Sequence, residues 1–245
     1  MNCLITGKVA SGKSTALYKV ADMLGVKRCA GLLAGEILEA GERKGFYSLG
    51  LHSRRRIVLA HKDIEKTHAV EDFGVDLESF EELCQNEFVS ALSDEDIRFI
   101  IVDEIGRMQL MSARFQKLLE EIAMSEKTLI ASICYDDDLD FVREFKRRED
   151  MKLFILDEEN RNRIPLEVVL EVTRDDNVYQ GKLDLARKYR SEKERYSYEG
   201  DRIVLNSTHG RRAITRQDGI WHCDCDYYME TGTCSHILSL LLPDE

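Results

Sequence analysis

Eight residues near the N-terminus constrain the fold more than any other part of the chain. The stretch Gly7-Lys8-Val9-Ala10-Ser11-Gly12-Lys13-Ser14 satisfies the pattern G-x-x-x-x-G-K-[ST] and follows the apolar run NCLIT at residues 2–6. A segment of helical period, residues 13–24, comes next. Strand, glycine-rich loop and helix in this order direct backbone N–H groups and the positive end of the helix dipole at one point. The pattern therefore predicts a phosphate-binding loop that continues into Thr15, within an α/β fold.

The rest of the first 170 residues supports this fold class. Apolar runs expected as buried strands lie at 97–102, 128–133 and 152–156, and helical spacing recurs at 76–92, 112–124 and 138–147. Their alternation predicts a mainly parallel sheet between two layers of helices, a three-layer sandwich. Residues 29–62 differ, because two extended stretches around a turn at 39–45 suggest a β-hairpin. Beside it, Arg54, Arg55 and Arg56 are expected at a solvated strand edge.

Composition and charge exclude several classes of protein. With 245 residues and 43% hydrophobic content, the chain can bury one main core plus a small module. The net charge is −11, and residues 1–180 hold 25 basic and 35 acidic residues, so this part is not expected to attract nucleic acid. No run approaches the roughly 20 apolar residues that span a bilayer, and the N-terminus lacks signal-peptide character. We expect no membrane partner and a cytoplasmic location.

Two carboxylates follow the apolar run FIIV at residues 99–102. Asp103 would hold Mg²⁺ together with the Ser14 hydroxyl, while Lys13 would neutralise β- and γ-phosphate oxygens. Glu104 would orient or deprotonate the attacking water, so Glu104 and Lys13 are expected as catalytic groups. A helix N-cap is the alternative explanation of the two carboxylates, and the phosphate loop favours the metal site. A water-activating carboxylate also favours hydrolysis over the alternative of a nucleotide or polynucleotide kinase.

Four stretches resemble a known family: ITGKVASGKST, FGVDLESFEEL, IIVDEIGRMQL and FKRREDMKLFILDEENRNRIP. Through them, residues 1–172 are similar to the P-loop nucleoside-triphosphatase family of thermophilic prokaryotes, which includes the cancer-related nucleoside-triphosphatase. The resemblance implies slow, Mg²⁺-dependent hydrolysis of nucleoside triphosphates, ATP and GTP among them, to diphosphate and phosphate. It also implies the three-layer P-loop sandwich.

Three further residues are candidates for contact with the nucleotide. Hydrolysis needs positive charge in the transition state beyond Lys13 and Mg²⁺, and Arg107, after the second motif, is the first candidate. A solvated surface arginine is the alternative. Asn160 and Arg161 follow the last strand, where this class of fold brings residues near the base or ribose. A helix-capping loop is the alternative explanation for these two.

The end of the chain carries a different kind of site. Cys223, Cys225, Cys234 and His236 follow the spacing C-x-C-x₈-C-x-H and supply three thiolates and one imidazole, the ligands of a closed tetrahedral Zn²⁺ site. Such a site folds the chain around it and leaves no position for catalysis. The segment from about 181 to 242 resembles the SWIM-type zinc finger, with short strands expected at 202–205, 213–215 and 220–222. This resemblance implies contact with a protein or a nucleic acid.

Three parts are therefore expected: a P-loop domain at 1–174, a linker helix at 175–200 and a zinc finger at 201–245. Acidic residues surround the metal ligands, which favours a protein partner over nucleic acid. Any nucleic-acid contact is expected instead at Arg211, Arg212 and Arg216. A second function hypothesis is a regulatory module in which bound nucleotide switches the affinity of the tail and hydrolysis is incidental.

Overall fold

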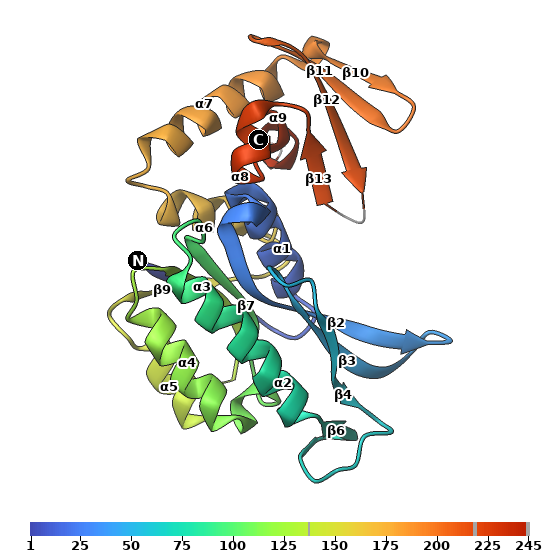
Figure 1. The fold of residues 1–245 in the computed structure, drawn as a ribbon, viewed down its shortest axis with the longest axis vertical. Helices are drawn as coiled ribbons and strands as arrows, with labels where there is room; N and C mark the ends of the chain where they lie inside the picture. Colours follow the sequence, from blue (N-terminus) through green and yellow to red (C-terminus); the bar gives the residue numbers. More distant parts are fainter. Residues whose placement is uncertain (137, 218–219, 244–245) are drawn as a thin grey trace. The chain divides into compact units, whose positions relative to one another are not determined.

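The computed structural model describes residues 1–136, 138–217 and 220–243. By its internal contacts the chain divides into two compact units (Figure 1). The N-terminal unit comprises Met1–Tyr18 and Cys29–Arg161, and the C-terminal unit comprises Lys19–Arg28 and the residues from Asn162 onward. Helix α1 (Lys13–Leu24) therefore begins in one unit and ends in the other. The boundaries at residues 174 and 200 stay predictions.

Within the described residues, the N-terminal unit is built on a nine-stranded sheet with the order β5-β6-β4-β3-β2-β7-β8-β1-β9. Its strands are β1 (Asn2–Thr6), β2 (Cys29–Glu39), β3 (Glu42–Gly50), β4 (Arg56–His61), β5 (Ala69–Val70), β6 (Phe73–Val75), β7 (Phe99–Ile105), β8 (Thr128–Ile133) and β9 (Met151–Ile155). Strands β2, β7, β8, β1 and β9 run parallel, and β3 to β6 extend the sheet with antiparallel pairs. The α/β class and the hairpin, formed by β2 and β3, are confirmed.

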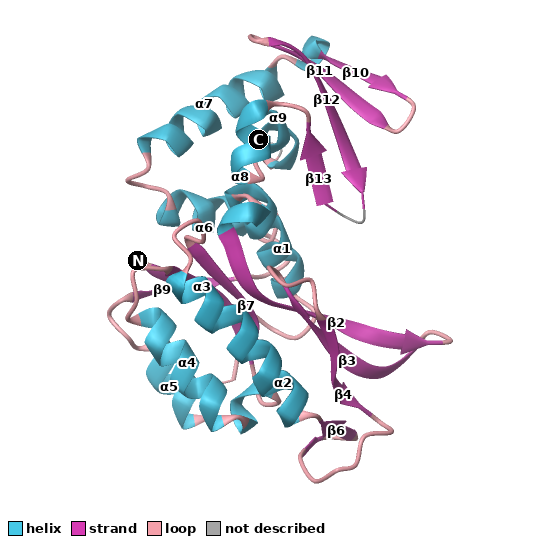
Figure 2. Cartoon of the chain, in the orientation of Figure 1, coloured by secondary structure: helices cyan, strands magenta, loops and turns pink. Residues whose placement is uncertain are grey.

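Helices cover one face of this sheet (Figure 2). They are α2 (Leu77–Cys84), η2 (Gln85–Val89), α3 (Ser90–Ser93), the 3-10 turn η3 (Gln109–Met111), α4 (Ala113–Ala123) and α5 (Asp140–Lys146). Phe80, Phe115 and Phe145 from these helices share one core cluster with Ile100 and Val102 of β7. The alternate residue of β7, Ile101, is also fully buried. Burial on both faces explains the continuous apolar runs in the parallel strands and agrees with a three-layer sandwich.

The helix expected at 76–92 is interrupted by a π-helical turn, η2. Asp76 caps its start by accepting a 3.0 Å hydrogen bond from the backbone N–H of Ser79. In the turn, the Glu87 side chain is buried and accepts hydrogen bonds from the backbone N–H groups of Gly31, His52 and Ser53 at 3.3, 3.1 and 2.8 Å. A single carboxylate therefore joins this helix to β2 and to the loop after β3.

The described part of the C-terminal unit contains a four-stranded antiparallel sheet in the order β10-β11-β12-β13. Its elements are the 3-10 turns η1 (Val26–Arg28) and η4 (Lys193–Arg195), helices α6 (Ile164–Val172), α7 (Asn177–Ser191), α8 (Asp226–Thr231) and α9 (Ser235–Leu241), and strands β10 (Tyr196–Glu199), β11 (Arg202–Ser207), β12 (Gly210–Gln217) and β13 (Ile220–Cys223). The core joins Tyr189 of α7, Leu205 and Ile214 of the sheet, and Ile237 of α9. No helix among the described residues has both the length and the apolar character needed to cross a bilayer.

The prediction of one helix over residues 175–200 is wrong for the last third of that range. The helix ends at Ser191, and residues Tyr196–Glu199 form strand β10, which pairs with residues 202–205 of β11. Alternating aromatic and polar residues in the stretch YSYE suit a strand, and pairing with β11 outweighs the helical spacing. Helix α7 is also more than a connection, because Tyr189 is fully buried in the core of the C-terminal unit.

Candidate nucleotide site and cysteine–histidine cluster

The phosphate loop is held in a compact form by its own lysine. Lys13 Nζ donates hydrogen bonds to the carbonyl oxygens of Gly7 and Lys8 at 3.0 and 3.4 Å, which keeps the ammonium at the mouth of the loop. Gly12 has φ +103°, in the left-handed region that favours glycine. A Cβ at Gly7 would lie 2.3 Å from the carbonyl oxygen of Leu156, so only glycine fits beside the end of β9. The close approach of Gly7 to Leu156 therefore holds the phosphate loop against the residue that follows β9.

Asp103 lies at the carboxyl end of β7 and is only 3% exposed. Burial raises the pKa of its carboxyl group, while the nearby hydroxyl groups of Ser132 and Ser14, the Ala34 backbone N–H and the charge of Lys13 lower it. Its Oδ2 atom is buried without a hydrogen-bond partner among the described residues. An orphaned carboxylate oxygen near a serine hydroxyl offers the oxygen ligands that a hard cation such as Mg²⁺ prefers.

Ser132, at the end of β8, belongs to the same site and is absent from the sequence-based prediction. Its Oγ donates a 2.6 Å hydrogen bond to Asp103 Oδ1, and both side chains are buried. Strands β7 and β8 are parallel neighbours, so their carboxyl ends meet at one edge of the sheet. The signal was available, because Ser132 is a polar residue within the apolar run TLIASI.

Glu104 follows Asp103 directly and is half-buried. Burial raises the pKa of its carboxyl group, Lys13 lowers it and Asp103 raises it further. Arg107, the candidate for transition-state charge, instead forms an ion pair with the exposed Asp138. Both Glu104 and Arg107 act on the pKa of Cys134, which burial raises, so Arg107 is in the neighbourhood of the site with its charge already paired.

Asn160 lies in the loop after β9, and its amide group is used within that loop. It donates to the Ile155 carbonyl at 2.8 Å and accepts from the Asp157 backbone N–H at 2.9 Å. Arg161 is exposed, and its backbone N–H bonds to the Asp157 carbonyl at 3.1 Å. These contacts favour a loop-stabilising role for Asn160, and a nucleotide contact by Asn160 or Arg161 stays a prediction.

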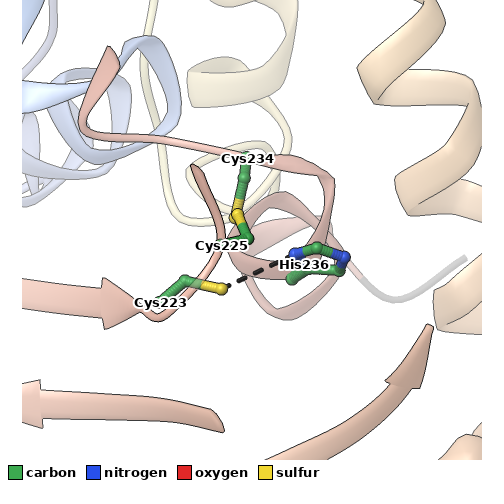
Figure 3. Close-up of side chains that lie close together, drawn as sticks. All are labelled: Cys223, Cys225, Cys234 and His236. Carbon is green, nitrogen blue, oxygen red and sulfur yellow. Dashed lines mark hydrogen bonds between the residues drawn. The ribbon is translucent and has the colours of Figure 1, made fainter. Parts of the chain in front are cut away.

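The four residues expected to bind zinc converge in the C-terminal unit (Figure 3). One ligand atom from each of Cys223, Cys225, Cys234 and His236 lies within 4.8 Å of all the others, and all four residues are buried. Cys223 Sγ and His236 Nδ1 are 3.5 Å apart. Ligands of a tetrahedral zinc–sulfur site are separated by roughly 3.7 Å, so the cluster needs little adjustment to close around Zn²⁺.

Tyr189 orients the histidine of this cluster and was not predicted. Its ring stacks on the His236 imidazole with 5.7 Å between the ring centroids and 20° between the planes. The Tyr189 hydroxyl is in turn 2.9 Å from the Thr208 hydroxyl. Tyr189 belongs to α7, whereas His236 belongs to α9, after the four strands β10 to β13. Helix α7 therefore packs against a candidate zinc ligand that is distant in the sequence.

The three arginines expected at a nucleic-acid contact do not share one face of β12. Successive side chains of a strand alternate, which separates Arg211 from Arg212 and Arg216. Arg211 is paired with Glu199, and the Arg216 guanidinium carbon lies 5.3 Å from the centroid of the Trp221 ring. Arg212 and Arg216 lie on the face that buries Ile214. Their spread weakens the case for one basic patch.

A glycine-rich loop between β1 and the start of α1, together with an Asp-Glu pair near the carboxyl end of the parallel strand β7, defines the N-terminal unit as a P-loop nucleotide-binding domain. The model of the family described as NTPase matches residues 2–169. The chain belongs to this NTPase family, a family of enzymes, and the prediction of a nucleoside-triphosphate phosphatase is confirmed at that level.

Individual relatives agree. Over 169 residues the chain is 35% identical to nucleoside-triphosphatase THEP1 of Thermotoga sp. strain RQ2, covering 69% of this chain and 94% of the relative. The crystal structure of THEP1 from Aquifex aeolicus matches with TM-score 0.62 and 29% identity, over 69% of this chain and 96% of the other. The solution structure of a human cancer-related nucleoside triphosphatase matches with TM-score 0.61 and 27% identity, over 71% and 97%.

Proposed function

We propose that the chain hydrolyses nucleoside triphosphates, ATP and GTP among them, to nucleoside diphosphate and phosphate with Mg²⁺ as the cofactor. The observation that carries this proposal is the buried, unpartnered Oδ2 of Asp103, close to Ser14 and to the Lys13 ammonium. Ser14 and Asp103 would hold Mg²⁺, which would neutralise charge on the phosphates. Membership of the NTPase family supports the reaction class.

The remaining roles follow from position. Backbone N–H groups of residues Gly7 to Thr15 would cradle the phosphates, and Lys13 would exchange its bonds to the loop carbonyls for bonds to phosphate oxygens. Glu104 would accept a proton from the attacking water, and its raised pKa makes it a better base once ionised. Arg107 would contribute positive charge to the transition state only after its ion pair with Asp138 is broken. Of the two candidates for base or ribose contact, Arg161 is preferred, because the Asn160 amide group is already hydrogen-bonded within its loop.

The tail is proposed to be a structural zinc site of the SWIM type. Three buried sulfur atoms and one imidazole nitrogen within 4.8 Å match the ligand set of a closed site. Zinc binding is worth about 10–16 kcal/mol in small zinc-dependent folds, which is ample for a segment this short. Zinc would thus organise the C-terminal unit and take no part in the reaction.

The tail is further proposed to contact a protein partner in preference to nucleic acid. Arg211 is neutralised by Glu199, and Arg212 and Arg216 lie on the other face of β12. Asp224, Asp226 and Glu230 add negative charge close to the proposed metal ligands. Phosphate backbones bind where unpaired basic residues gather, and this distribution does not provide such a surface.

Phosphate release across the nucleoside triphosphates tests the main proposal. The wild-type chain should release phosphate only with Mg²⁺, Lys13→Ala should abolish turnover and Glu104→Gln should lower kcat on the order of 100-fold. Equal turnover in all three proteins would overturn hydrolysis at this site. Transfer of phosphate to an added nucleoside or polynucleotide, with no free phosphate, would support the kinase alternative instead.

A further inference from the structure

Three side chains beside the candidate nucleotide site have no role in the proposed chemistry. Tyr18 of α1, Tyr47 of β3 and Arg56 of β4 form what we call the arginine–tyrosine cluster. The Arg56 guanidinium carbon lies 3.8 Å from the centroid of the Tyr47 ring, which is a close stacking contact. The pKa of Tyr18 is raised to about 12, mainly by burial and also by hydrogen bonding to Tyr47. The sequence-based expectation of a solvated edge does not account for this packing of Arg56.

The backbone connects this cluster to Asp103. Tyr47 is opposite Gly35 in the β2–β3 register, and a Cβ at Gly35 would come within 2.3 Å of the Tyr47 ring. The ring therefore lies directly on the backbone of β2. Strand β2 also pairs in parallel with β7, and Leu32 of β2 is opposite Val102, the residue before Asp103. Gly35, on which the ring lies, is three residues beyond Leu32 along β2, so the ring that carries Arg56 lies near the end of the sheet that holds Asp103.

Helix α1 makes the same connection from the other side. Tyr18 follows Ser14 by four residues, so the two side chains lie one above the other on the helix surface. Asp103 and Arg56 both act on the Tyr18 phenol, Asp103 raising its pKa and Arg56 lowering it. The cluster is therefore on the side of the phosphate loop where Ser14 and Asp103 meet.

The charge of Arg56 differs from that of the neighbouring arginines. Arg55 forms a 2.7 Å ion pair with Glu82, and Arg107 is paired with Asp138. Arg56 has no carboxylate partner among the described residues, and its guanidinium is exposed while the ring below restricts its movement. Stacking on an aromatic ring leaves the N–H edge of a guanidinium free for an anionic ligand.

We propose that Arg56, held by Tyr47, binds the terminal phosphate of a nucleoside triphosphate seated in the phosphate loop. This rests on the proposed function only in its choice of ligand. Charge on the transferring phosphate grows in the transition state, and a guanidinium aimed at it is the kind of group that stabilises that charge. Arg56 then supplies the positive charge that Arg107, paired with Asp138, does not offer.

Binding of a non-hydrolysable ATP analogue and of ADP, each with Mg²⁺, tests this contact. Arg56→Ala should weaken the analogue at least tenfold and leave ADP within about twofold of wild type, because only the analogue has the third phosphate. Arg55→Ala, the matched control, should change neither affinity. Tyr47→Phe should keep the triphosphate preference and Tyr47→Ala should lose it, since the ring and not the hydroxyl carries the stack.

Turnover gives a second readout. Arg56→Ala should lower kcat on the order of 100-fold, and Arg56→Lys should recover only part of it because lysine is a point charge without the planar fork. Unchanged analogue binding in Arg56→Ala, or equal weakening of analogue and ADP, would overturn the proposal. The two proposals can fail separately. If the wild-type protein releases no phosphate, hydrolysis is refuted. If the Arg56→Ala variant of that same protein still loses the preference for the triphosphate analogue over ADP, the Arg56 contact stands.

Discussion

Ser132 Oγ donates a 2.6 Å hydrogen bond to Oδ1 of Asp103 and so joins the carboxyl ends of β8 and β7. With Oδ1 fixed, the second oxygen of the carboxylate, Oδ2, keeps one orientation in a buried site. Ser132 therefore acts through Asp103, as a positioning residue. Partners of this kind commonly change metal affinity by 10–100-fold when they are removed.

Ser132→Ala should raise the Mg²⁺ concentration that half-saturates phosphate release by about tenfold, because Asp103 loses the bond that orients it. Ser132→Thr keeps the hydroxyl and should stay close to wild type. The Mg²⁺ dependence of nucleotide binding, measured without turnover, provides an independent check. Equal Mg²⁺ requirements in the alanine and threonine variants would show that the hydrogen bond does not position Asp103.

Cys234→Ser should reduce the zinc content from about one ion per purified chain to well below that, since it removes one of four ligands. Cys134→Ser, the same change in the N-terminal unit, should leave the zinc content unaltered. Trp221 is the single tryptophan and lies in β13, so its fluorescence should change when a chelator removes the metal. Protein isolated without zinc and with unaltered fluorescence on chelation would contradict a structural metal site.

Glu87→Gln should destabilise the N-terminal unit by about 2–3 kcal/mol, because the amide NH₂ cannot accept hydrogen bonds from backbone N–H groups. The carboxylate now accepts three of them from Gly31, His52 and Ser53 in a buried position. Urea unfolding followed by far-ultraviolet circular dichroism measures the effect. Glu82→Gln, on the exposed face of α2, is the control and should cause little change.

Asp22→Asn should make stability less dependent on pH. Burial raises the pKa of Asp22 from 3.8 to about 6, with Arg216 acting in the opposite direction. A folded-state pKa above the unfolded value means that the wild-type chain loses stability as pH rises from about 4 to about 6, by at most about 3 kcal/mol. The asparagine variant should therefore be more stable than wild type at pH 7–8.

The advantage of Asp22→Asn should shrink as pH falls through 6 and vanish below about pH 4, where the wild-type carboxyl becomes protonated in the unfolded state as well. Chemical unfolding of both proteins between about pH 3 and 8 measures it. Asp184→Asn on α7, an exposed site, should show no such trend. A constant difference across the pH range would mean that Asp22 does not titrate with a raised pKa.

The sequence by itself determined the parts that depend on local pattern. Three of these parts are short motifs whose residues are close together in the chain: the phosphate loop, the Asp103-Glu104 pair and the Cys-His spacing. The buried strands were recognised in the same way, each from its own apolar run. Helix and strand periodicity located α1, α4 and β7 because burial on one or both faces forces a regular spacing of apolar residues. The same periodicity failed at residues 196–199, where pairing with β11 outweighed the helical spacing.

Only the tertiary structure decided which distant side chains meet. Ser132 and Asp103 are 29 positions apart, and Tyr189 and His236 are in different helices. Likewise, Arg54, Arg55 and Arg56 are three identical side chains in sequence, yet Arg55 pairs with Glu82 and Arg56 stacks on Tyr47. Sheet register and the alternation of side chains across a strand assign these partners, and both are set by long-range packing that no local pattern encodes.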